Sequence, residues 1–153
     1  MGDLGFLGIN KPEAYGGLGL DYSYAAVYCE TLGRISCGGV PMAIGVQTEM
    51  ATPALARFGS DELREEFLAP SIAGEKVACL GVSEVGAGSD VASITTTAVK
   101  DGDDYVLNGT KQYISNAGYA EMFIVFAKVD GDKFTGFIVE RDLPGVSIGS
   151  PVE

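Results

Sequence analysis

Histidine and tryptophan are missing from this 153-residue sequence, and cysteine occurs only three times. Without histidine, the chain holds neither a histidine general base nor a Ser-His-Asp triad. The cysteines, Cys29, Cys37 and Cys79, form no CxxC pair, which excludes the common zinc sites. An odd number of widely spaced thiols is typical of buried cysteines in a reducing compartment.

Basic residues are also scarce. Ten Lys and Arg residues stand against 21 Asp and Glu, which gives a formal net charge of −11. The few basic side chains form no cluster or stripe, and an acidic surface repels a phosphate backbone. We therefore expect no nucleic-acid partner.

Long apolar runs are absent as well. Hydrophobic residues make up 46% of the chain, which is enough for a core. The longest runs, such as Met122 to Ala127, are nevertheless far shorter than the roughly 20 residues that span a bilayer. The opening residues lack a basic region followed by an apolar stretch, and Phe6 stands where a myristoylation signal has Ser or Thr. We expect a soluble chain without a transmembrane segment, in which any targeting segment has been removed or never existed.

The first seventy residues have the pattern of helices joined by loops. Asp21 is placed to cap a helix from about Tyr22 to Leu32. A second helix is predicted over Pro41 to Met50, with a kink or restart at Pro53. Ser60 is placed to cap a third helix, and Pro70 is predicted to end it.

After Gly74 the pattern changes from helical to alternating. Ile94 to Thr97 is β-branched, and Asn108-Gly109 between two strand-like runs predicts a hairpin. DGDD predicts a turn, and MFIVFAKV-DGDK-FTGFIVE predicts another hairpin. The fold class is therefore α+β, with an all-helical part in residues 1–75 and an antiparallel β part in residues 76–153.

The loop between these strands, GVSEVGAGSDVAS at Gly81 to Ser93, has three interpretations. It is a plain mobile connection, a nucleotide phosphate loop, or a set of donors aimed at a bound planar or anionic group. The phosphate-loop reading fails, because Val91 stands where a dinucleotide fingerprint has Gly or Ala and no Gly-Lys-Ser/Thr follows. In the third reading, backbone N–H groups and the hydroxyls of Ser83 and Ser89 are the donors.

The same thirteen residues resemble the first signature of the acyl-CoA dehydrogenase family, position for position. LGINKPEAYGGLGLDY, FGSDELREEFLAPSIAGE, LNGTKQYISNAGYAEMFIVFAKV and TGFIVERDLPGVSIG are similar to the same family in the same order. The resemblance covers nearly the whole chain. It implies a partial N-terminal helical domain and a β-barrel-like or sandwich-like middle domain, truncated at its C-terminal end, with the C-terminal helical domain absent.

The resemblance also implies FAD as the cofactor. Ser83 and Ser115 match hydroxyls that bond the flavin ring, Tyr113 matches an aromatic residue packed on it, and Ser89 matches a contact to both flavin phosphate and substrate. Many members carry tryptophan and threonine where Tyr113 and Ser115 stand here. Glu84 and Asp90 are expected to support the loop rather than to react. The implied cofactor-binding set is Leu80, Gly81, Val82, Ser83, Gly86, Ala87, Gly88, Ser89, Tyr113, Ile114 and Ser115.

By the same resemblance, the reaction oxidises an acyl-CoA thioester to the 2,3-enoyl-CoA, by removal of an α-proton and transfer of the β-hydrogen as hydride to flavin N5. The base is a glutamate of the C-terminal domain, so no catalytic residue is assigned in this chain, and the chain alone is expected to be inactive. Implied partners are the acyl-CoA substrate, an electron-transfer flavoprotein and further copies in a homotetramer or dimer. The implied compartment is the mitochondrial matrix in a eukaryote and the cytoplasm in a bacterium.

Two alternatives stay open. One is an acyl-CoA oxidase, which differs in how oxygen reaches the flavin. The other is a truncated, non-catalytic homologue that binds acyl-CoA or a partner. The acyl-chain specificity is equally open, because residues of Val40 to Met50 line either an acyl pocket or an ordinary core: Met42, Ile44, Val46 and Met50.

Overall fold

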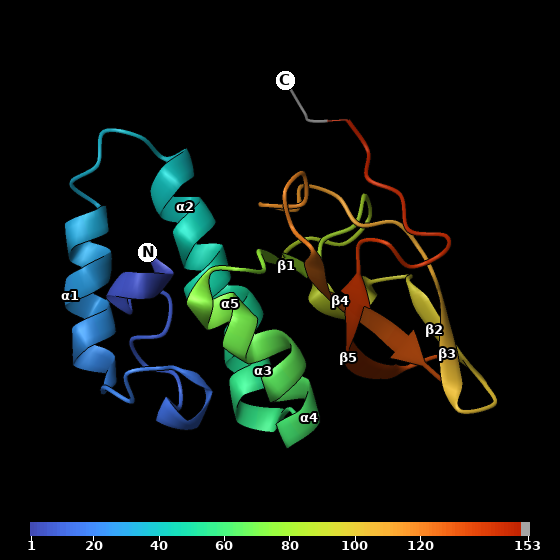
Figure 1. Ribbon diagram of the computed structural model, residues 1–153. Coiled ribbons are helices and arrows are strands. Elements are labelled where there is room, and N and C mark those ends of the chain that lie inside the picture. Colours follow the sequence, from blue (N-terminus) through green and yellow to red (C-terminus); the bar gives the residue numbers. More distant parts are fainter. Residues whose placement is uncertain (151–153) are drawn as a thin grey trace.

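The computed structural model describes residues 1–150 and divides them into a helical part and a sheet (Figure 1). The helices occupy the chain up to Ala73, and the first strand begins at Ala78. This agrees with the predicted α+β class.

The N-terminal segment consists of two short 3-10 turns and one helix. The turns are η1 (Gly2–Leu4) and η2 (Glu13–Tyr15), and the helix is α1 (Tyr22–Leu32). Asp21 caps α1 as predicted, since its carboxylate accepts a hydrogen bond of 2.8 Å from the backbone N–H of Ser23.

The second predicted helix is longer than expected and contains a π-helical turn. It runs without a break through α2 (Gly39–Gly45), the π-turn η3 (Val46–Ala51) and α3 (Thr52–Phe58). The predicted end at Met50 is wrong, because the π-turn leads directly into α3, whose first turn contains Pro53, where a kink or restart was expected. In a π-turn, a carbonyl accepts from the backbone N–H five residues ahead. For Thr48 that residue is Pro53, which has no N–H, so the Thr48 carbonyl lacks this partner.

Another side chain satisfies that carbonyl. Lys11 is buried, and its Nζ donates to the Thr48 carbonyl oxygen at 2.7 Å and to Asn10 Oδ1 at 2.7 Å. Burial lowers the pKa of Lys11, and the nearby Glu49 carboxylate opposes that shift.

The third helix repeats this pattern. It combines α4 (Asp61–Leu63), the π-turn η4 (Arg64–Leu68) and α5 (Ala69–Ala73). Ser60 caps it as predicted, accepting from the Leu63 N–H at 3.3 Å. The predicted end at Pro70 is wrong, because a proline within the first turn after the π-turn is tolerated. Gly74, at a φ of 83°, ends the helix in the left-handed conformation.

The sheet is built on the long strand β4 (Met122–Val129), which pairs in antiparallel fashion with β5 (Lys133–Glu140). β2 (Thr97–Asp101) and β3 (Asp104–Asn108) form the other hairpin, around the predicted DGDD turn. The pairings that β4 makes with β1 (Ala78–Gly81) and with β2 are parallel. Alternation within a strand gives no information on such long-range pairings.

Two strand predictions are wrong. β2 begins at Thr97 rather than Ile94, because a short 3-10 turn, η5 (Val91–Ser93), and three irregular residues precede it. Asn108-Gly109 forms no hairpin, and neither residue has a positive φ. Gly109 serves a close approach instead, since an added Cβ would lie 2.2 Å from the Thr96 hydroxyl oxygen.

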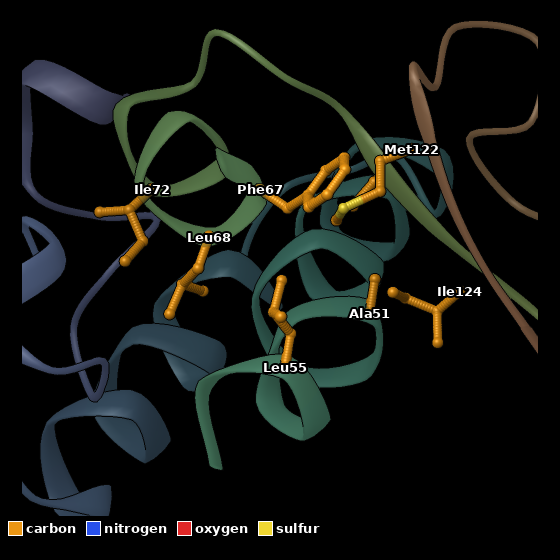
Figure 2. Packing of buried hydrophobic residues seen from close by; sticks show 8 residues of the cluster. Ala51, Leu55, Phe67, Leu68, Ile72, Met122 and Ile124 are labelled. Atoms are coloured by element: carbon orange, nitrogen blue, oxygen red, sulfur yellow. The ribbon is translucent and has the colours of Figure 1, made fainter. Parts of the chain in front are cut away.

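The main core lies where the helices pack on β1 and β4, as Figure 2 shows. Ala78, Met122 and Ile124 face the helices, while their strand neighbours Cys79 and Phe123 pack on the opposite side in a second cluster. The helical members of the main core are Ala51, Leu55, Phe67, Leu68 and Ile72. This interface fixes β1, and therefore the loop that follows β1, against the helices.

The cysteines only partly fit the sequence-based expectation. Cys79 is buried, and burial raises the pKa of its thiol to about 12, whereas Cys29 and Cys37 are exposed. Within residues 1–150, no helix is both long and apolar enough to cross a bilayer. Over the same residues, no group of potential ligands gathers to hold a metal ion.

Candidate functional site

Two loops that are far apart in the sequence meet at one end of the sheet. The first loop runs from Gly81, the last residue of β1, to Ser89, and the second follows β3 and includes Tyr113 to Ser115. The backbone N–H of Gln112 donates to the Ser83 carbonyl at 2.8 Å, and Lys111 Nζ donates to the Val82 carbonyl at 3.1 Å. The structure therefore brings together the two segments that carry the predicted cofactor-binding residues.

The first loop contains a tight turn with an exposed tip. Glu84 and Ala87 exchange two backbone hydrogen bonds of 2.9 Å and 3.1 Å, which places Val85 and Gly86 at the tip. An added Cβ on Gly86 or Gly88 would meet no protein atom within 4 Å. The fold itself therefore gives no steric reason for these two glycines, which leave open space beside the loop.

Glu84 is the centre of a buried polar cluster beneath that turn. Its side chain is only 6% exposed, and one carboxylate oxygen accepts from the Thr95 N–H and hydroxyl, both at 2.7 Å. The other oxygen accepts from Lys111 Nζ at 2.7 Å and from the Thr96 N–H at 3.0 Å and its hydroxyl. Burial alone would raise the pKa of Glu84, but these donors outweigh burial and hold it far below its usual range.

The cluster also explains the late start of β2. The backbone N–H groups of Thr95 and Thr96 are taken by the Glu84 carboxylate rather than by a neighbouring strand. The structural role expected for Glu84 is confirmed. Asp90 likewise stabilises its turn, since its carboxylate accepts from the Ser93 hydroxyl and its carbonyl accepts from the Ser93 N–H.

Gly109 gives a testable consequence of this packing. Thr96 is buried and held by Glu84, so it cannot move away from a new methyl group at position 109. We expect Gly109→Ala to destabilise the protein by about 1–3 kcal/mol through overpacking. Thermal unfolding checks this, with Gly102→Asn as a control at an exposed turn where φ is 61°. Equal stability of Gly109→Ala and the wild type would contradict the packing argument.

The second loop is irregular, although it follows Asn108-Gly109, where the second strand-like run of the predicted hairpin was expected. Tyr113 lies in a bend with a φ of 58°, and Ser115 begins a turn. Tyr113 is 73% exposed, whereas Ile114 packs against the second hydrophobic cluster. A positive φ is costly for an aromatic residue and marks a constrained position.

Two residues that the sequence analysis did not single out hold this loop. The Asn116 amide donates to the Ala43 carbonyl at 3.0 Å and to the Ala78 carbonyl at 3.3 Å. The Arg141 guanidinium donates to the Ala117 carbonyl at 2.6 Å and to the Ala120 carbonyl at 2.7 Å. All these acceptors are backbone oxygens distant in sequence, so no local motif could have revealed them.

Polar groups of both loops are available to a bound molecule. Within residues 1–150, the hydroxyls of Ser83, Ser89 and Ser115 have no hydrogen-bond partner in the protein, and none is found for the buried Gln112 Oε1. Ser83 is half-buried, while Ser89 and Ser115 are exposed. A hollow of about 490 Å³ beside Lys11 and Arg57 includes no residue of either loop. The donors therefore lie on an open surface rather than in a closed pocket.

The possible acyl-pocket residues divide into two groups. Val46 is buried in the second hydrophobic cluster, whereas Met42 and Met50 are about half exposed. Ile44 is intermediate. The core interpretation therefore applies to Val46 but not to the two methionines.

Comparison with known proteins agrees with these features. The family model "Acyl-CoA dehydrogenase, N-terminal domain" matches residues 1–75, and "Acyl-CoA dehydrogenase, middle domain" matches residues 79–153. A probable acyl-CoA dehydrogenase of Bacillus subtilis is 44% identical over 150 residues, which cover 97% of this chain and 25% of that protein. The human mitochondrial short-chain specific acyl-CoA dehydrogenase is 37% identical, over 97% of this chain and 37% of that protein.

A solved structure shows the same likeness in three dimensions. The acyl-CoA dehydrogenase from Bacillus anthracis, complexed with FAD, superposes with a TM-score of 0.92 and 40% identity. The match covers 99% of this chain and 26% of that one. The chain thus spans about a quarter to two fifths of the relatives that it matches. Both family models, the sequence relatives and the superposition agree, and the chain belongs to the acyl-CoA dehydrogenase family.

Proposed function

We propose that the protein is an FAD-dependent acyl-CoA dehydrogenase that oxidises an acyl-CoA thioester to the 2,3-enoyl-CoA. One observation carries this proposal. In a member of this family, two loops meet that both carry hydroxyls without a protein partner within residues 1–150. One loop has glycines that face open space, and the other has an exposed aromatic residue at a positive φ.

The residues present fit a flavin. The open space at Gly86 and Gly88 allows the backbone to approach a planar group closely, and Gln112 Oε1 is a buried acceptor without a protein donor. When bound, FAD supplies the hydride acceptor. The residues that we propose to hold it are Leu80, Gly81, Val82, Ser83, Gly86, Ala87, Gly88, Ser89, Tyr113, Ile114 and Ser115.

The chain contributes binding and electrostatics rather than the proton transfer. Fixed hydroxyl donors at Ser83 and Ser115 favour a cofactor that gains electron density, and the Tyr113 face supplies apolar contact area. Ser89 is proposed to contact substrate as well as cofactor.

Glu84 is unsuitable as the base that removes the α-proton. Its carboxylate already accepts hydrogen bonds from Lys111 and from two threonines, and its pKa is held far below its usual range. A general base needs a pKa nearer the working pH and a free oxygen within reach of the proton. We propose that the base comes from outside this chain's 153 residues, which leaves this chain inactive by itself.

The experiment is a titration of the full-length protein with FAD, followed by addition of acyl-CoA without oxygen. Binding with a visible flavin band, then bleaching by acyl-CoA, supports the proposal. Ser83→Ala is expected to weaken FAD binding by roughly tenfold, the equivalent of one hydrogen bond of about 1.4 kcal/mol. Ser36→Ala is the matched control, because Ser36 is exposed and lies outside both loops.

Other outcomes separate the alternatives. A flavin that binds but stays oxidised with every acyl-CoA contradicts the dehydrogenase, and a protein that binds acyl-CoA without FAD indicates the non-catalytic homologue. Rapid reoxidation of the reduced flavin by oxygen indicates an oxidase, whereas reoxidation by an electron-transfer flavoprotein supports the proposed partner. Sedimentation of the same sample tests the proposed homotetramer or dimer.

A further inference from the structure

Ala78, the first residue of β1, is held on both polar atoms of its backbone by side-chain amides. The Ala78 N–H donates to Gln47 Oε1 at 2.6 Å, and the Ala78 carbonyl accepts from Asn116 Nδ2 at 3.3 Å. Ala78 is fully buried, so water does not replace either contact. We refer to Gln47, Asn116 and Ala78 as the amide joint.

Gln47 ties this joint to the helices. It belongs to the π-turn η3 and is only 6% exposed. Besides accepting from Ala78, its Nε2 donates to the carbonyls of Ser71 in α5 and of Lys76, both at 3.0 Å. One side chain thus connects the second helix, the third helix and the start of β1. π-Turns of this kind occur often at functional sites.

Asn116 ties the joint to the second loop. It follows Ser115 directly, it has a φ of 70°, and its amide also reaches the Ala43 carbonyl in α2 at 3.0 Å. Ala78 lies two residues before Leu80, which is the first residue of the proposed FAD-binding set. The amide joint therefore lies at the base of both loops and links each of them to the helices.

We propose that Gln47 and Asn116 are positioning residues for the flavin site, setting the first loop and the second loop in register with each other and with the helices. This inference rests on the proposed function. Neither residue belongs to the proposed FAD-binding set, and each acts through Ala78. Donors in a binding site must be held to within a fraction of an ångström, so a small shift of β1 displaces Ser83 from the flavin atom that it is proposed to bond.

The test compares FAD affinity, the position of the flavin absorption band and thermal stability in variants of the full-length protein. Asn116→Gly keeps the positive φ and removes the amide, and Gln47→Met keeps the side-chain length and removes all three hydrogen bonds. Each variant is expected to weaken FAD binding by roughly tenfold and to shift the flavin band. Ser71→Ala is the control, because its buried hydroxyl bonds only the Phe67 carbonyl. It is expected to lower the unfolding temperature without changing FAD affinity.

The double variant sharpens the test. Because both amides act on Ala78, their combined effect on FAD affinity is expected to be smaller than the product of the single effects. If one single variant fails to fold, the other decides with the same readouts. Variants that lose thermal stability but bind FAD as the wild type does overturn the inference and leave the proposed function standing. A wild-type protein that binds no FAD overturns both.

Discussion

Glu84→Ala is expected to destabilise the protein by about 3–5 kcal/mol, the range found when one partner of a buried ion pair is removed. The Lys111 side chain is only 11% exposed and would lose the carboxylate that lies 2.7 Å away. The Thr95 and Thr96 donors would also lose their acceptor. Urea denaturation monitored by circular dichroism measures the change.

Two companion variants make this prediction specific. Glu66→Ala removes an exposed carboxylate from the same chain and is expected to change stability by less than about 0.5 kcal/mol. Lys111→Met in the Glu84→Ala background is expected to recover part of the loss, because it removes the unpaired charge. If Glu84→Ala unfolds at the same urea concentration as the wild type, the carboxylate is not the centre of the cluster.

The ion pair of Glu84 and Lys111 also predicts how the stability of the protein depends on pH. The pKa of Glu84 is depressed in the folded state, so its contribution is present in full above the unfolded pKa of roughly 4.3 and is lost as the pH falls below that value. The stability difference between the wild type and Glu84→Gln is therefore expected to be constant from pH 7 to 5 and to shrink in more acidic buffer. A difference that grows on acidification would contradict the depressed pKa.

Leu68→Ala is expected to cost about 2–5 kcal/mol. Leu68 is fully buried in the main core, in the π-turn η4, and Figure 2 shows it among the helical residues Leu55, Phe67 and Ile72. Truncation leaves a cavity that the surrounding helices only partly fill. Chemical denaturation measures the loss.

Leu63→Ala serves as the comparison for that core variant. Leu63 is 38% exposed in the same helix, so its truncation is expected to cost much less. Equal losses for Leu63→Ala and Leu68→Ala would contradict the burial of Leu68 in the main core.

Local signals in the sequence predicted the local structure. The Asp21 and Ser60 caps form because the side-chain oxygen and the N–H that it bonds lie two or three residues apart. The β4–β5 hairpin follows from alternation around a DGDK turn. The prolines led to wrong predicted helix ends at Met50 and Pro70, because the π-turns before Pro53 and Pro70 accommodate the N–H that each proline lacks.

The wrong hairpin at Asn108-Gly109 has a different cause. The dipeptide favours a tight turn by itself, yet here it follows β3, and the β2–β3 register places Gly109 opposite Thr96 with no room for a side chain. The parallel pairing of β1 with β4 could not be predicted from local sequence either, since the two strands are separated by about forty residues.

The candidate site was predictable only as two separate segments. The loop composition around Ser83 and the likeness to a known family named its residues, and Glu84 was correctly expected to be structural. Gln47, Lys111, Asn116 and Arg141 were missed because each bonds groups more than twenty residues away. Their side chains have no local motif, and only the fold shows what they support.

The central claim is that the two loops form one flavin site. The most direct test is a crystal structure of the full-length protein with FAD. We predict the flavin ring against Tyr113, with the hydroxyls of Ser83 and Ser115 within about 2.5–3.2 Å of its polar atoms. A flavin bound elsewhere, with both hydroxyls free, would contradict the account.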